Sequence, residues 1–229
     1  ASYKARRVLV ASTRGGSMRG RLVASTSLDP VDGFRYEVLE EDGSGVIRRK
    51  VLRAALEAER TLVASGDGAR GSLSDINYRF TPMRDIEDGL VKVLIHPKRK
   101  DTMLIDGAMF VAEGDGDLVR LEGQLVKRPS FWTRRVIVTR RYERVAGVRV
   151  PVAMTSTASV LIVGTSTFSM TYEYESINGF PAAAADFQAT TQDGKTVGGR
   201  ISFLSFGGST YQLIGYTLAR ADEGNVAPI

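Results

Sequence analysis

One change of hydrophobic period constrains the fold of this chain more than any other feature. In "SGVIRRKVLRAALEAERTLVA", apolar residues recur at nearly helical spacing from Ile47 to Leu62. Ser44 stands where an N-cap belongs, and "SGDG" at 65–68 is typical of a helix end. We therefore predict one amphipathic helix over residues 44–64, and its apolar face must pack against another element.

Short strands are expected on both sides of this helix. Residues 5–39 contain three apolar stretches separated by glycine-rich or Asp-Pro turns, and from Tyr78 onward similar stretches follow one another with turns between them. In "GFRYEVLEED", Phe34, Tyr36 and Val38 alternate with charged residues. This alternation is typical of antiparallel strands that have one buried and one solvated face, so the sequence predicts a mainly β meander.

The arginine-rich stretch "WTRRVIVTRRYERV" admits two interpretations, a nucleic-acid surface or a solvated strand. Read as a strand, it places Val136 and Val138 on one face with Arg140, and Ile137 on the other face with Arg135. No nucleic-acid recognition motif accompanies the arginines. The pattern favours an amphipathic strand whose arginine stems cover apolar surface while their charged ends reach water.

The sequence contains no recognisable catalytic motif, although serines and acidic residues are plentiful. The 229 residues include no cysteine and a single histidine, His96, which cannot by itself form a multi-histidine zinc site. There is no G-x-S-x-G nucleophile elbow and no phosphate-binding loop, and "EGDGDL" at 113–118 lacks the order of an EF-hand. We predict a protein that is not an enzyme, with no catalytic residues, metal or cofactor; a hydrolase with an unrecognised site is the competing hypothesis.

Several stretches resemble the LolA-like lipoprotein-carrier superfamily, especially bacterial outer-membrane lipoprotein-sorting proteins. They include "RRKVLRAALEAE", "NYRF", "DGLVKVLIHPKRKDTMLIDGAMFV", "GDLVRLEGQLVKRPSFWTRRVIVTRRYERVAGVRVPVAM" and "FSMTYEYESING", and cover most of residues 20–179. The resemblance implies a mainly β fold with few helices: a curved, incomplete antiparallel barrel over residues 1–179, closed by one or more helices. Its interior would hold acyl chains.

Residues 180–229 are expected to form a C-terminal extension. "INGFPAAAADFQAT" and "GRISFLSFGGSTYQLIGYT" resemble the tail region of periplasmic zinc metalloproteases, but the chain has no H-E-x-x-H motif and cannot inherit their activity. A β-hairpin is predicted at about 200–217, with "GGS" at 207–209 as its turn. Because an isolated hairpin is marginal in water, we expect it to pack on the main domain. A natural extension and a fusion are both compatible with the sequence.

The first functional hypothesis is a periplasmic carrier or sensor that binds a lipid, an acyl chain or a lipidated protein in an apolar cavity. Large apolar side chains on the expected inner face are the candidates for its lining, although each of them is compatible with an ordinary core. They are Phe34, Tyr36, Leu52, Leu56, Tyr78, Phe80, Leu104, Phe110, Val136, Val138, Met154, Leu161, Phe168, Met170 and Tyr172.

The alternative hypothesis is an interaction module of the cell envelope. Its basic residues, "HPKRK" at 96–100 together with Arg134, Arg135, Arg140 and Arg141, would bind a protein partner or an anionic surface. Salt would weaken such binding but not the burial of an acyl chain. No transmembrane segment is predicted, because no apolar run approaches the roughly 20 residues that span a bilayer. No nucleic-acid partner is predicted, because no recognition motif is present. The chain starts at Ala1, as after removal of a signal peptide, which is the basis for expecting a periplasmic location.

Overall fold

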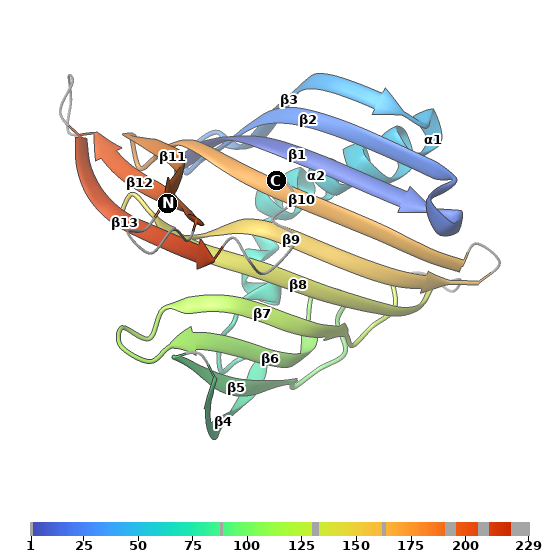
Figure 1. The fold of residues 1–229 in the computed structure, drawn as a ribbon. Helices are drawn as coiled ribbons and strands as arrows, with labels where there is room; N and C mark the ends of the chain where they lie inside the picture. Colours follow the sequence, from blue (N-terminus) through green and yellow to red (C-terminus); the bar gives the residue numbers. More distant parts are fainter. Residues whose placement is uncertain are drawn as a thin grey trace.

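A computed structural model describes residues 2–87, 89–129, 133–161, 164–190, 196–205 and 211–220. Within these residues the fold is mainly β: strands pair antiparallel in one sheet, and one long helix lies against it (Figure 1). The strands are β1 (Tyr3–Thr13), β2 (Met18–Asp29), β3 (Gly33–Gly43), β4 (Tyr78–Glu87), β5 (Leu90–Pro97), β6 (Ile105–Ala112), β7 (Leu118–Leu125), β8 (Thr133–Val145), β9 (Val148–Val160), β10 (Gly164–Ile177), β11 (Phe180–Thr190), β12 (Thr196–Ser205) and β13 (Tyr211–Arg220).

The main sheet has the order β3-β2-β1-β10-β9-β8-β7-β6-β5-β4. The N-terminal strand β1 pairs along its length with β10, so segments far apart in the sequence become neighbours inside the sheet. No pairing joins β3 to β4 in the described part of the chain, and the sheet therefore stays open rather than closing into a barrel.

The predicted helix is confirmed. Helical structure runs without a break through α1 (Gly45–Ile47), a π-helical turn η2 (Arg48–Arg53) and α2 (Ala54–Ala64). Ser44 occupies the N-cap position, although its hydroxyl forms no capping hydrogen bond, and Gly66 follows the end in a left-handed conformation. A short 3-10 helix, η3 (Asp67–Gly71), continues the connection toward β4.

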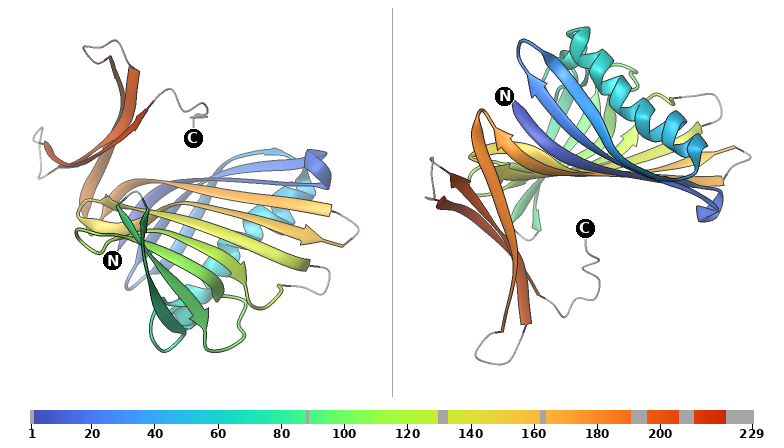
Figure 2. Two further views of the ribbon diagram at one scale, coloured as in Figure 1. Left: turned by 60° about the horizontal axis from the view of Figure 1, so that its bottom comes forward. Right: turned by 90° about the horizontal axis from the view of Figure 1, so that it is seen from above.

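The connection from β3 to β4 determines where the helix lies. These strands form opposite edges of the main sheet, so the connection between them, which includes the helix, has to cross one face. The helix begins beside β2, with Ile47 against Gly20, and ends beside the start of β3, with Val63 near Gly33. The sheet is bent, and the helix runs across its concave side (Figure 2).

Two glycines facing each other mark a sharp bend. Gly107 of β6 and Gly123 of β7 are register partners, and a Cβ atom on either would lie 2.1 Å or 2.3 Å from a backbone oxygen of the neighbouring strand. Only glycine fits where two strands approach so closely, and glycine at such a position permits a tight bend. Register shifts in β2, β6 and β8 mark further irregularities of the ladder.

The alternation expected from the sequence sets the two faces of the sheet. Phe34 is buried and in register with Leu28, whereas Arg35 faces solvent. In β8, Val136 and Val138 are buried on the concave side, and Ile137 lies on the convex side. The predicted strand over the arginine-rich stretch is therefore confirmed; Trp132 lies outside the described residues.

The C-terminal extension branches from the main sheet. β11 pairs with β10 only through Ser176↔Pro181 and Ile177↔Phe180, and then continues into a three-stranded ladder with β12 and β13. In both views of Figure 2 this ladder projects from the main sheet. The "GGS" turn lies outside the described residues, and the packing of the hairpin on the main domain stays a prediction.

Candidate functional site

The helix and the concave face of the sheet enclose the first buried cluster. Ile47, Leu52 and Leu56 from the helix pack on Leu9 of β1 and Leu22 of β2. Gly20 allows this close approach, because a Cβ atom there would lie 2.9 Å from Ile47 Cγ2. The helix therefore forms a lid over β1, β2, β3 and β10.

A buried ion pair fastens the same lid. Arg7 of β1 is 1% exposed, and its guanidinium donates to both carboxylate oxygens of Glu59 on α2, at 2.6 Å and 3.0 Å. The guanidinium carbon also lies 4.5 Å from the ring centre of Tyr172 and 5.0 Å from that of Phe34, and Nη2 donates to Tyr3 Oη. The charge is thus removed from water but surrounded by a carboxylate and aromatic faces.

This environment shifts several ionisation equilibria. Burial by itself lowers the pKa of Arg7, but the hydrogen bond and charge of Glu59 outweigh it, so the pKa is raised. Burial raises the pKa of Tyr172 to about 12 and also raises the pKa values of Tyr3 and Tyr174. At neutral pH the arginine is therefore charged and these tyrosines are neutral.

An apolar pocket of about 280 Å³ lies at the other end of the helix. Ile47 and Val51 form its helical wall, and Ala11, Ala158 and Phe168 line it from β1, β9 and β10. The space exists because the strands carry small side chains beneath the first turns of the helix. Hydroxyl groups at its rim pair with one another: Ser12 Oγ lies 2.8 Å from Thr167 Oγ1, and Thr13 Oγ1 lies 2.8 Å from Ser166 Oγ.

The predicted cavity-lining residues divide between two apolar clusters. The first cluster, under the helix, contains Phe34, Tyr36, Leu52, Leu56, Met154, Phe168, Met170 and Tyr172. The second, on the part of the sheet formed by β4–β8, contains Tyr78, Phe80, Leu104, Val136 and Val138, and Met154 packs against both. Of the whole predicted set, Phe168 is the member that lines the 280 Å³ pocket.

Two predicted residues lie away from these clusters. Phe110 is buried, but its register partners Lys92 and Arg120 lie on the convex side, and the Arg120 guanidinium stands 4.0 Å from its ring centre. Leu161 is half-buried in the turn after β9. In "AMFV" both faces are apolar, so alternation does not reveal which residue points inward; Met109 packs on the second cluster instead.

The sequence analysis missed Arg7, Glu59 and the small residues that leave the pocket open. A signal was present for Arg7, because in "ARRVLVAST" it shares its phase with Ala5, Leu9 and Ala11, all of which are buried. An arginine on the apolar face of a strand indicates a buried partner. No local pattern identified Glu59 as that partner, because the two residues belong to elements that meet only in the folded chain.

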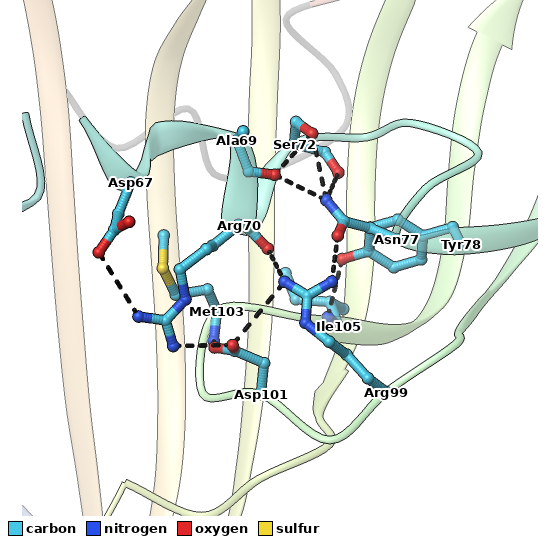
Figure 3. Close-up of polar contacts among 10 residues, drawn as sticks. All are labelled: Asp67, Ala69, Arg70, Ser72, Asn77, Tyr78, Arg99, Asp101, Met103 and Ile105. Carbon is cyan, nitrogen blue, oxygen red and sulfur yellow. Dashed lines mark hydrogen bonds and ion pairs between the residues drawn. The ribbon is translucent and has the colours of Figure 1, made fainter.

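A polar cluster fixes the chain around η3 to the loop after β5 (Figure 3). Arg70 Nη2 donates to Asp101 Oδ2 at 2.9 Å, and Arg99 Nη2 donates to the carbonyl oxygen of Arg70 at 2.7 Å. The buried Asn77 amide donates to the Ala69 carbonyl oxygen at 2.9 Å and accepts from Arg99. These contacts hold residues 98–101 in one conformation at the end of the sheet.

Comparisons with known proteins do not assign a family. No family model matches the chain, and neither a curated protein nor a solved structure shows significant similarity to it. In the part of the chain that the structure describes, no helix is long and apolar enough to cross a membrane, and no three histidine or acidic side chains gather as a metal site would require.

Proposed function

We propose that this protein binds one acyl chain, or an apolar ligand of similar shape, between the helix and the concave face of the sheet, without catalysing a reaction. The observation that carries the proposal is the 280 Å³ pocket, in which Ala11, Ile47, Val51, Ala158 and Phe168 provide apolar walls and serines and threonines provide the remaining lining residues. Its volume lies just below the range of about 300–1,000 Å³ in which drug-sized ligands bind, so it suits a single chain. Burial of that chain would supply affinity at about 25 cal/mol per Å².

The construction of the lid supports the same proposal. The π-helical turn Arg48–Arg53 includes Val51, which lines the pocket, and π-helical turns are frequent at functional sites. Glu41 of β3 accepts hydrogen bonds from Arg53 at 2.7 Å and from Arg48 at 3.3 Å, so two contacts anchor this turn. Loosening this short segment would enlarge the pocket while the rest of the helix stays attached through Arg7 and Glu59.

The resemblance to LolA-like carriers gives the proposed role its context. A bent antiparallel sheet with a helix on its concave side agrees with the fold that the resemblance implies, although the sheet is open. In this role the protein would be a periplasmic carrier or sensor, and its cargo a lipid or a lipidated protein. A carrier must release its cargo, so the π-helical turn should open more readily than the strands.

The test is titration of the purified protein with a fluorescent fatty acid, with native mass spectrometry to count bound ligands. Wild-type protein should bind one ligand with the same affinity at low and high salt. Ala158→Phe should abolish binding because the added ring fills the pocket. Val31→Phe is the matched control, since Val31 is 93% exposed in the turn between β2 and β3.

Thermal melts of each variant separate loss of the pocket from loss of the fold. Phe168→Asp provides a second probe, from the neighbouring strand β10 of the same sheet wall, and should also weaken binding. The proposal fails if wild-type protein binds no fatty acid. It also fails if a folded Ala158→Phe variant binds as wild type does.

A further inference from the structure

A second concavity lies on the convex side of the sheet, away from the helix. It is a groove of about 680 Å³ at the end of the sheet where β5 and β7 finish and β6 and β8 begin. His96, Lys98, Arg99 and Lys100 line one side, and Arg135 lines it from β8. Segments 35 residues or more apart in the sequence thus combine into one basic surface.

The charge of this groove is one-sided. Asp106 is the acidic residue of its lining, and it pairs with His96 at 2.9 Å. Lys100 and Arg135 are exposed and form no ion pair within the described residues. Lys127 and Arg128, which immediately follow the groove residue Val126, are exposed as well. Unpaired cations concentrated around a concavity attract an anionic partner.

The basic wall is held in place before any partner arrives. Arg99 donates to the Arg70 carbonyl oxygen and to Asn77, and Lys98 Nζ donates to the carbonyl oxygen of Asp75 (Figure 3 shows the Arg99 contacts). These bonds fix the loop backbone and leave Lys100 at its exposed end. Fewer protein side chains would therefore become ordered when a ligand binds, and this reduces the entropic cost of association.

The floor of the groove favours a polypeptide over a membrane surface. Pro97, Leu125 and Ile137 contribute apolar area to this floor. A flat lipid surface would meet the exposed cations but not this recessed floor. An extended chain can place carboxylates against the basic rim and an apolar side chain between them.

We propose that this convex groove is a docking site for an acidic peptide segment in which glutamate or aspartate alternates with apolar residues. The proposal is independent of acyl-chain binding on the concave side. It assigns Lys100 and Arg135 to contact carboxylates from opposite sides of the groove, and Ile137 to contact the apolar side chain between them.

Fluorescence anisotropy with a labelled decapeptide of alternating glutamate and valine tests the proposal. Wild-type protein should bind this peptide, and high salt should weaken the binding. The double variant Lys100→Glu/Arg135→Glu should bind about tenfold more weakly or worse, because each reversal brings like charges together. A decapeptide of alternating lysine and valine should not bind.

The matched control is Arg49→Glu/Lys50→Glu, which changes the net charge equally on the exposed side of the helix. It should retain wild-type peptide affinity. If both double variants lose peptide affinity equally, net charge explains the effect and the docking site is ruled out. Absence of peptide binding to the wild-type protein would also rule it out. The last experiment measures binding to vesicles of phosphatidylglycerol. If the protein binds these vesicles but does not bind the peptide, the proposal is overturned and the partner of the groove is a membrane surface.

Discussion

Replacing Glu59 by glutamine is the most direct test of how the helix is fastened to the sheet. The change removes the negative charge that faces Arg7, whose side chain is 1% exposed, and leaves the arginine buried without its counterion. Breaking a buried ion pair from one side costs about 3–5 kcal/mol. Because the Glu59 side chain is 32% exposed and aromatic rings also face Arg7, we expect the lower end, about 3 kcal/mol.

Urea and thermal unfolding followed by circular dichroism measure this effect. For a chain of this size, 3 kcal/mol corresponds to a drop in Tm of roughly 6–12 °C. Glu173→Gln is the matched control, because Glu173 is 56% exposed and pairs with Arg6 across the sheet surface at 3.4 Å. Its removal should cost less than about 1 kcal/mol.

A double replacement separates the buried charge from the packing. Arg7→Met with Glu59→Leu substitutes apolar side chains for both partners, and such replacements of buried ion pairs are often neutral or stabilising. We therefore expect the double variant to regain most of the stability lost in Glu59→Gln. The argument is refuted if Glu59→Gln is no more destabilising than Glu173→Gln.

Three further predictions address the sheet, the polar cluster and the core. Gly123→Ala should destabilise the fold by at least about 2 kcal/mol in urea unfolding, because the added Cβ would lie 2.3 Å from the Asp106 carbonyl oxygen. Gly114→Ala is the control: its Cβ would meet no atom within 4 Å, and the free energy of unfolding should change by less than about 0.5 kcal/mol. The hydrogen bond from Arg70 holds the pKa of Asp101 below its usual value. The stability that the Asp101 carboxylate contributes is therefore present above about pH 4 and is lost as the pH falls through the lowered pKa. Urea midpoints measured from neutral to acidic pH should depend less on pH in the Arg70→Leu variant. Leu52→Ala, at a fully buried position under the helix, should cost about 2–5 kcal/mol by thermal unfolding, and a cost below 1 kcal/mol would contradict the packing described.

The local structure of this chain could be predicted from its sequence in considerable detail. The helix at residues 44–64 and the inward faces of β3, β8 and β10 follow from the spacing of apolar residues alone. That spacing is informative because a helix and a strand repeat with fixed periods, whatever lies next to them. Where both faces of a strand are apolar, as in "AMFV", the same rule cannot choose between them, and Phe110 was assigned to the wrong face for that reason.

Tertiary structure alone decided which elements meet. β1 pairs with β10, and the helix packs over β1, β2 and β3, which brings Glu59 to Arg7. The order of β5 to β8 joins residues 96–100 to Arg135 in the groove. The apolar pocket also depends on this arrangement, because Ala11 and Ala158 leave space only where the start of the helix passes over them. The hydrophobic period specifies which side of each element is buried. It does not specify which element packs against that side, because many strand orders would bury the same residues.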